Sequence, residues 1–260
     1  MNIPAQCILL LDPEPFYMPH LAAKLAAAGR IRAVVVRHQK FSGAKTAARS
    51  VQRLIRAWGM LTLARFAIAR LMAMASDRLF PHRYYSIEKV AREFGLPIYY
   101  VNKIHSDEFY GLLSAQPDPL VFSQVSARLK PELLGRAVFV NKHCGLLPAY
   151  AGVYPVFWAL LNREDRLGVT VHVMAEEYDA GELLAQTSVA AQGHSVSSAY
   201  HALYDRAADL LLRLFSSSTP AIPQEGARSY FSWPSSADRK RFSRQGGRFG
   251  SPFRLHPPIQ

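Results

Sequence analysis

Residues 137–152 read AVFVNKHCGLLPAYAG, and this stretch is the most informative part of the chain about its fold. It begins with an apolar run typical of a buried strand, and polar side chains follow at Asn141 and His143. In open α/β sheets, ligands bind at the carboxyl edge of the strands. An Asn can donate an N–H to a developing oxyanion, and a His two residues later lies on the same side of an extended chain. The stretch therefore predicts a reactive site at the edge of a sheet.

Strands and helices alternate along the rest of the chain, as they do in a doubly wound α/β domain. Before the quoted stretch we expect strands at residues 7–11, 31–36, 98–101 and 120–122, and helices at 20–28, 45–76 with a weak point at Gly59, 86–94 and 107–115. The quoted stretch itself opens with a strand at 137–140, and we then expect a strand at 169–174, an apolar run at 183–190 and a core-facing helix at 196–215. The turn at residues 12–16 reads DPEPF and lacks the G-x-G-x-x-G spacing that seats a dinucleotide.

The chain is strongly basic, with a formal net charge of +12. No acidic residue occurs between Pro15 and Ser76, whereas eleven basic residues do: Lys24, Arg30, Arg32, Arg37, Lys40, Lys45, Arg49, Arg53, Arg56, Arg65 and Arg70. A field of this sign attracts phosphates, nucleic acid, acidic membrane surfaces or polyanionic small molecules. On a helical wheel, Lys45, Arg49, Arg53 and Arg56 fall within about 80° of one another, which predicts one basic stripe.

The second half of this basic insert, residues 60–75, is mostly apolar. Arg65 and Arg70 would each cost roughly 2.5 to 3.5 kcal/mol at a bilayer centre, so a transmembrane helix is not expected. The pattern favours a helical pair with a solvated basic face over an anion-binding or membrane-surface site. The N-terminus lacks the features of a signal peptide, and Cys7 and Cys144 are too few for a disulfide framework. We therefore expect a cytoplasmic protein.

Two further segments supply polar groups for the candidate site. GVTVH at residues 168–172 enters another strand, and YDAG at 178–181 offers a carboxylate in a turn. An Asn, a His and an Asp together can stabilise an oxyanion and move a proton. His172 alternates inward on its strand and is expected to be structural. Cys144 lacks the second His and carboxylate that a cysteine nucleophile needs, and the histidines show no metal-ligand spacing.

Taken in order, these segments resemble the signature of the folate-dependent formyltransferases, roughly N-x-H-x-S-L-L-P-x-Y-x-G, then G-x-T-x-H, then D-x-G. The resemblance covers most of residues 5–190, and the insert at 45–76 lies outside the pattern. It implies a Rossmann-like α/β formyltransferase domain over residues 1–190. Residues 191–260 would then form a short C-terminal helix and an irregular arm rich in aromatic and basic residues.

The same resemblance implies 10-formyltetrahydrofolate as cosubstrate and assigns the catalytic roles to Asn141, His143 and Asp179. Asn141 and a protonated His143 would stabilise the tetrahedral oxyanion, while Asp179 holds the charge of the imidazole. No metal is expected, because the histidines lack ligand spacing. The resemblance places the remaining contacts on two groups of residues: for the folate Arg128, Leu129, Glu176, Glu177 and Tyr178, and for the acceptor Pro148, Tyr150 and Gly152.

Departures from the pattern bear on the acceptor. Gly145 stands where Ser is usual, and Ala151 stands where Arg is frequent. The segment after residue 190 is too short for the C-terminal barrel of the methionyl-tRNA branch, so we expect a small primary amine. The aromatic arm resembles the sugar N-formyltransferases, which suggests a nucleotide-linked amino sugar, with the basic insert facing a diphosphate or an anionic lipid carrier. Nucleic acid is not an expected partner. Hydrolysis of the formyl-folate and a non-catalytic anion- or membrane-surface-binding module stay open as alternatives, as does the oligomeric state.

Overall fold

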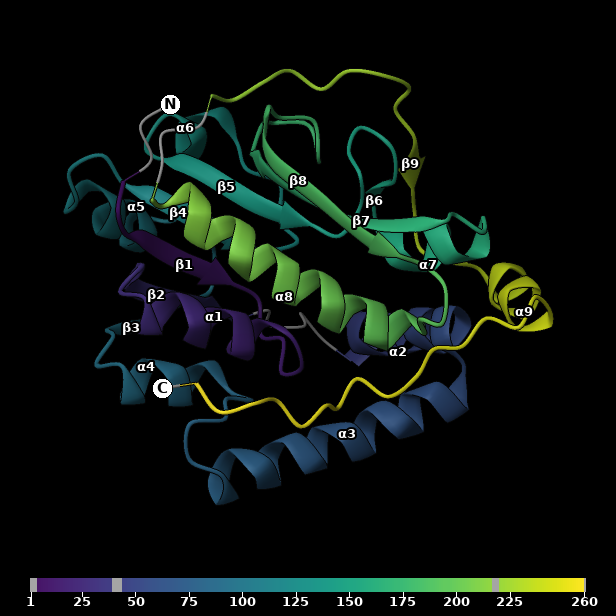
Figure 1. The fold of residues 1–260 in the computed structure, drawn as a ribbon. Helices are drawn as coiled ribbons and strands as arrows, with labels where there is room; N and C mark the ends of the chain where they lie inside the picture. The colour runs from purple at the N-terminus through teal and green to yellow at the C-terminus, as the bar shows by residue number, and fades with distance from the viewer. Residues whose placement is uncertain (1–3, 39–43, 217–219, 260) are drawn as a thin grey trace.

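The structure, a computed structural model, describes residues 4–38, 44–216 and 220–259 (Figure 1). Lys40 and the side chain of Lys45, both counted among the bases above, lie outside the described part. A seven-stranded sheet runs through the centre of the molecule. Its strands in spatial order are β3 (Ile98–Val101), β2 (Ile31–Arg37), β1 (Cys7–Leu11), β4 (Leu120–Gln124), β5 (Val138–His143), β7 (Arg166–Val173) and β8 (Leu183–Ala190).

The first five strands in this order are parallel, which confirms the doubly wound arrangement. Strands β7 and β8 are antiparallel to their neighbours and form a hairpin at one edge, a feature that simple alternation did not predict. Side chains of β1 alternate between two cores: Leu9 and Leu11 face one cluster, and Ile8 and Leu10 face the other. Figure 1 shows the helices on both faces of the sheet.

One face carries α1 (Met18–Ala27), α4 (Ile87–Glu93) and α8 (Val196–Leu214), and the other carries α5 (Asp107–Ser114) and α6 (Pro131–Leu134).

Strand β5 is longer than expected and includes the site residues that were thought to follow it. Asn141 and His143 pair with His172 and Thr170 of β7, so the ladder continues to the end of β5. Alternation along β5 sends Val140 to the core under α1 and α8 and Phe139 to the core under α5 and α6. Asn141 and His143 therefore share the side of Phe139, and Lys142 lies on the opposite side.

The basic insert forms two helices, α2 (Ala44–Trp58) and α3 (Met60–Leu79), as expected. They separate at Gly59, whose φ of 78° is easily adopted only by glycine. Within the described residues no single helix is long and apolar enough to cross a membrane. Residues Ala48–Trp58 and Met60–Leu79 pass such a test only as a pair, and they are bent by 107° relative to each other.

The C-terminal segment is more ordered than an irregular arm. After α7 (Pro155–Leu161) and the long helix α8, strand β9 (Tyr230–Phe231) pairs in parallel with β6 (Ala151–Gly152). Helix α9 (Ser236–Arg244) was not expected, although Ser235 and Asp238 form a capping box whose S-x-x-D spacing is visible in the sequence. The final residues then run between α8 and α3 (Figure 1).

Position 181, in the expected D-x-G segment, requires glycine because its backbone lies very close to that of Val173. A Cβ at this position would lie 1.9 Å from the carbonyl oxygen of Val173 on the neighbouring strand. We predict that Gly181→Ala lowers the free energy of unfolding by more than about 2 kcal/mol, as overpacking of a backbone contact does. Urea unfolding measures the change. Gly111→Ala is the matched control, because nothing lies within 4 Å of its Cβ on α5 and the change should be neutral or stabilising. Equal stabilities of the two variants would contradict the prediction.

Candidate active site

A cavity of about 880 Å³ lies at the carboxyl ends of β4 and β5. This is the edge at which open α/β sheets bind ligands. Its walls come from the segment after β4 (125–129), the end of β5, the segment 152–154, the loop between β7 and β8 (174–179), and side chains of α2, α8 and residues 230–233. Asn141, His143, His172 and Asp179 all line it. The residues that the sequence singled out for chemistry therefore share one cavity.

Asn141 is held by a neighbouring strand. Its Oδ1 accepts a hydrogen bond from Gln124 Nε2, and the same amide of Gln124 donates to the backbone oxygen of Ser123 at 2.8 Å. Because Oδ1 is occupied, the Nδ2 amide is the part of Asn141 that can donate to a group in the cavity. The side chain is thus oriented as a hydrogen-bond donor.

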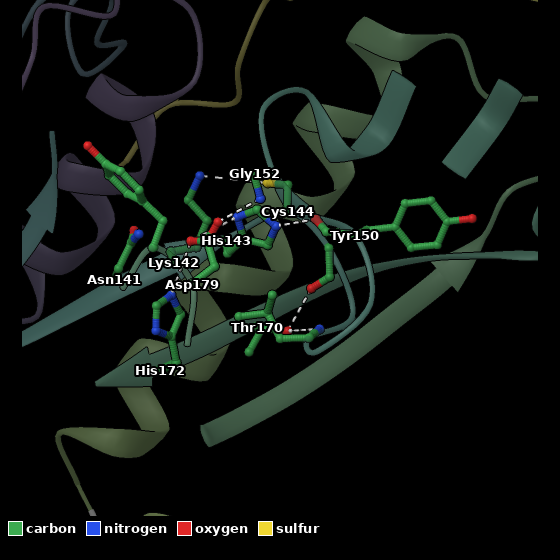
Figure 2. A network of polar contacts seen from close by, with 12 residues as sticks. Asn141, Lys142, His143, Cys144, Tyr150, Gly152, Thr170, His172 and Asp179 are labelled. Atoms are coloured by element: carbon green, nitrogen blue, oxygen red, sulfur yellow. Dashed lines mark hydrogen bonds and ion pairs between the residues drawn. The ribbon is translucent and has the colours of Figure 1, made fainter. Parts of the chain in front are cut away.

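His143 lies between a carbonyl group and a carboxylate (Figure 2). Its Nε2 is 2.7 Å from the carbonyl oxygen of Tyr150, so Nε2 carries a proton and donates. Its Nδ1 is 3.5 Å from Asp179 Oδ1. Nδ1 binds a proton only when the ring is cationic, and Asp179 stabilises that cation at short range. The side chain of His143 is 8% exposed, which limits screening of this pair by water.

Asp179 occupies a left-handed backbone conformation with φ of 53° at the tip of the β7–β8 loop. Its Oδ2 accepts a hydrogen bond of 2.8 Å from the backbone N–H of Gly152. Its own carbonyl oxygen accepts one of 2.9 Å from Gln224 Nε2. The first bond holds the carboxylate and the second holds the backbone of Asp179, and Oδ1 is left directed at the imidazoles.

His172 is the second imidazole at this carboxylate, and the sequence had suggested only a structural role for it. Its Nδ1 donates to the backbone oxygen of Val173 at 2.8 Å, and Nε2 lies 3.8 Å from Asp179 Oδ1. Burial lowers the pKa of His172 to about 4, so the ring is neutral at pH 7 and Nε2 is an acceptor. Among the described residues, this buried Nε2 has no hydrogen-bond partner.

Lys142 and Cys144 lie on the opposite side of the strand from this cavity. Lys142 Nζ is 3.3 Å from the centre of the Tyr204 ring and 3.7 Å from Cys144 Sγ. Burial lowers the pKa of Lys142 and raises the pKa of the Cys144 thiol. Cys144 is therefore poorly suited to act as a nucleophile, since the thiol form is not reactive.

The five residues expected to contact folate line one side of the cavity: Arg128, Leu129, Glu176, Glu177 and Tyr178. Arg128 Nε donates to the backbone oxygen of Glu176 at 3.0 Å, which joins the two segments. Leu129 is buried in the core beneath α6, whereas the side chains of Glu177 and Tyr178 are exposed. Glu177 forms an ion pair of 2.6 Å with Arg228.

Of the residues expected to contact the acceptor, Gly152 lines the cavity, whereas Pro148 and Tyr150 do not. The Tyr150 ring points away from Asp179 (Figure 2), stacks on Phe231 and donates from its hydroxyl to Glu164 Oε1 at 2.5 Å. Only the carbonyl oxygen of Tyr150 reaches the site, through His143. The Tyr150 ring thus lies outside the cavity lining, on a backbone with a positive φ of 59°.

Sequence reasoning did not assemble the second wall of the cavity, although Arg53 belongs to the predicted basic stripe. This wall consists of residues from four distant segments, which are Ser50, Arg53, Leu54, Tyr154, Tyr200 and Trp233. Arg53 lies 5.4 Å from the centre of the Trp233 ring, within range of a cation–π contact. Tyr200 sits at a core-type position of α8, so its helical spacing gave no sign of a binding role. No group of three or more His, Cys, Asp or Glu in the described part of the chain has the geometry of a metal site.

Comparison with known proteins places half of the chain in one family. The family model described as "Formyl transferase" matches residues 86–215. Methionyl-tRNA formyltransferase of Streptococcus suis is 35% identical over 130 residues, which are 49% of this chain and 42% of that protein. The enzyme of the same name from Streptococcus uberis is 36% identical over 104 residues, or 39% and 33% of the two chains. The match thus spans less than half the length of these relatives.

Solved structures share the fold. A sugar N-formyltransferase from a Shewanella species covers 87% of this chain and 76% of its own, with a TM-score of 0.53 and 16% identity. The N-formyltransferase of Helicobacter canadensis, solved with folinic acid and dTDP-3-aminofucose, covers 87% and 71%, with a TM-score of 0.54 and 15% identity. These similarities confirm the expected Rossmann-like formyltransferase fold.

Substitution of Gly145 can test how closely the imidazole of His143 is packed. A Cβ at residue 145 would lie 2.9 Å from His143 Nε2 and 2.9 Å from the Tyr150 carbonyl oxygen. We predict that Gly145→Ser, which restores the usual residue of the family pattern, displaces the imidazole and lowers the free energy of unfolding by about 1–3 kcal/mol. The chemical shifts of the His143 ring and urea unfolding measure both effects. Gly145→Ala should act alike, because it adds the same Cβ without a hydroxyl; unchanged ring shifts in both variants would contradict the prediction.

Proposed function

The chain belongs to the formyl transferase family, and from this premise we propose that it transfers a formyl group from 10-formyltetrahydrofolate to a primary amine of a small molecule. The observation that carries the proposal is the arrangement of Asn141, His143 and Asp179 on the wall of one large cavity. A volume of about 880 Å³ lies near the upper end of the usual range for small-molecule sites, about 300–1,000 Å³, so it offers room for two reactants.

Asn141 supports the proposal as an oxyanion donor. The acceptor nitrogen attacks the formyl carbon, and the formyl oxygen takes up negative charge in the tetrahedral intermediate. Because Gln124 occupies Oδ1, the Nδ2 amide of Asn141 is available to that oxygen. A donor fixed before the reaction stabilises the charge without reorganisation.

His143 and Asp179 supply the second part of this stabilisation. A cationic His143 places positive charge in a poorly hydrated site, and Asp179 Oδ1 at 3.5 Å stabilises that cation. This separation exceeds a normal hydrogen bond, so Nδ1–H can be shared between the carboxylate and a bound oxyanion. Such contacts often tighten only when the substrates bind.

Completing the transfer moves one proton from the attacking nitrogen to the leaving N10 of the folate as the bond between carbon and N10 breaks. Asp179 Oδ1 and the neutral Nε2 of His172 are acceptors within 3.8 Å of each other. The nitrogen loses its proton to this pair, cationic His143 donates its Nδ1 proton to N10 as the bond between carbon and N10 breaks, and the pair then passes its proton to His143. The amine and the folate thus exchange one formyl group and one proton, and the three side chains return to their starting protonation states.

The folate would lie against the segments 125–129 and 174–178. These segments offer backbone donors and acceptors together with the side chains of Leu129 and Met174, a combination suited to a flat, hydrogen-bonding heterocycle. The carboxylates of Glu176 and Glu177 are exposed, and Glu177 is paired with Arg228. The folate contacts thus rest mainly on backbone and apolar surface.

Features of the second wall favour an anionic acceptor. A groove of about 380 Å³ lies beside the cavity and is lined by Arg49, Arg53, Arg56, Trp233 and the residues that begin α9. Arg53 and Trp233 line both the groove and the cavity. Guanidinium groups bind phosphate oxygens in a bidentate manner, and an indole ring stacks on a flat base. We propose that the acceptor is a nucleotide-linked amino sugar, with its phosphates in the groove and its amine beside His143.

Hydrolysis is the rival reaction, in which water replaces the amine and formate is released. It needs the same oxyanion stabilisation but no phosphate-binding groove. Formate production without an amine would therefore favour the hydrolase, and turnover that depends on the amine favours the transferase. A protein that binds anions but neither binds nor turns over folate would be a non-catalytic module.

We predict that Asn141→Ala, His143→Ala and Asp179→Asn each lower kcat by about a hundredfold or more, because each removes stabilisation of charge that develops in the transition state. Formyl transfer to a panel of amino sugars measures the rate, and thermal unfolding shows whether each variant folds. Cys144→Ser is the control, since this thiol lies on the opposite side of β5 and the rate should stay within a few-fold of wild type. Near wild-type rates for His143→Ala or Asp179→Asn would refute the mechanism.

We predict that replacing Arg49, Arg53 and Arg56 together by Gln raises the KM for a phosphate-bearing acceptor at least about tenfold and weakens its dependence on salt. The KM for folate should stay unchanged, because these side chains line the other wall. A variant with Arg65, Arg70 and Arg78 of α3 changed to Gln removes the same charge outside the groove and serves as control. Equal acceptor KM values in the two variants would show that the groove does not bind the acceptor.

A further inference from the structure

Helix α3 exposes an apolar surface that the proposed transferase reaction does not use. On a helical wheel seven residues fall within about 100°: Leu61, Ala64, Ile68, Leu71, Met72, Ala75 and Leu79. The exposed fractions are 67% for Leu61, 58% for Ile68, 65% for Leu71 and 72% for Leu79. Large apolar side chains gathered in one exposed stripe mark an interaction surface rather than ordinary surface variation.

The opposite side of α3 is firmly attached, so the apolar stripe faces outward. Ala69, Ala73 and Ser76 are buried beneath the helix. At its C-terminal end, the buried Lys89 Nζ donates to the carbonyl oxygens of Asp77, Phe80 and Arg83 at 2.8 to 2.9 Å. A lysine that binds three carbonyl groups satisfies the end of a helix and opposes its dipole. The orientation of the stripe is therefore set by the fold.

Positive charge borders this stripe on both sides. Arg65 and Arg78 lie at its two margins on the wheel, and Arg70 lies further round the helix. The nearest carboxylate in the sequence, Asp77, is turned inward and accepts hydrogen bonds from the Tyr85 backbone N–H and Ser86 Oγ. A second copy of the chain would bring like charges together across the contact. An anionic surface would complement them.

The geometry of the insert favours a position on a membrane rather than across it. Helices α2 and α3 are bent by 107° relative to each other, and the arginines of α3 exclude its burial at the bilayer centre. An amphipathic helix with an apolar stripe and flanking arginines lies in the plane of the headgroups, with the stripe inserted.

We propose that the stripe of α3, with Arg65, Arg70 and Arg78, docks this protein on an anionic lipid bilayer. This inference goes beyond the proposed reaction and does not depend on it. Because α2 joins α3 through Gly59 and contributes Arg53 and Leu54 to the cavity, docking brings one wall of the cavity close to the bilayer surface.

Vesicle binding by the full-length chain tests the proposal without any assay of activity. We expect binding to phosphatidylcholine vesicles that contain phosphatidylglycerol, little binding to phosphatidylcholine alone, and weaker binding at high salt. Ile68→Glu/Leu71→Glu should lower the affinity for anionic vesicles at least about tenfold, because two apolar side chains no longer insert. Changing Arg65, Arg70 and Arg78 to Gln should also weaken binding and flatten its salt dependence.

The matched control is Val138→Glu/Ile222→Glu, which adds the same charge at exposed apolar residues on β5 and beside β8. Its vesicle binding should equal that of wild type apart from a small general charge effect. Absence of binding to anionic vesicles at moderate salt would overturn the proposal, as would equal binding by the control and by Ile68→Glu/Leu71→Glu. Dimerisation that is lost in Ile68→Glu/Leu71→Glu, without vesicle binding by wild type, would assign the stripe to a second copy instead and also overturn it.

Discussion

The hydrogen bond from the Gly152 backbone N–H to Asp179 Oδ2 joins the segments on which the site depends. One partner belongs to the β7–β8 loop and the other to β6, which β9 holds in place. Gly152 cannot be replaced without loss, because its φ is 96° and a Cβ would lie 2.2 Å from the Phe231 carbonyl oxygen. A partly buried carboxylate is costly unless it is paired, and this bond together with the ion pair to His143 offsets that cost. The same contact that joins the β7–β8 loop to β6 therefore also holds the carboxylate of Asp179 beside His143.

The sequence predicted which candidate residues come together better than it predicted the cavity around them. Asn141, His143 and Asp179 could be selected from the sequence because a buried strand and short motifs mark their positions. These are local signals, which a sequence displays directly. The antiparallel hairpin of β7 and β8 was not predicted, since a strand's direction follows from pairing between distant residues. The capping box of α9 at Ser235 and Asp238 is visible in the sequence, but the polar composition of this segment suggested an irregular arm. The Tyr150 ring and the inner wall at Tyr200 and Trp233 depend on backbone turns and tertiary contacts that leave no periodic trace.

The two walls of the cavity also differ in how they relate to the family. The family model matches residues 86–215, which include the strand with Asn141 and His143, the loop with Asp179, and the expected folate segments. Arg53, Leu54 and Trp233, in contrast, belong to α2 and to the segment after β9, which lie outside the match. The residues proposed for the reaction therefore lie in the segment that matches the family model, whereas Arg53, Leu54 and Trp233, which are proposed to lie beside the acceptor, are outside it.

The basic insert at residues 45–76, which contains no acidic residue, contributes both to the cavity and to the exposed surface of α3. Its arginines repel one another, and a charge pattern of this kind is costly in isolation unless anions are close by. Helix α2 directs Arg49, Arg53 and Arg56 to a groove beside the cavity, and α3 places its own arginines along an exposed apolar stripe. A single turn at Gly59 separates the two helices. The arginines of α2 and those of α3 can bind different anions. Because only Gly59 separates the two helices, a membrane bound by α3 and a phosphate bound by α2 would be held near each other. Both sets of arginines are thus placed to meet phosphate groups, one set beside the cavity and the other along the surface of α3.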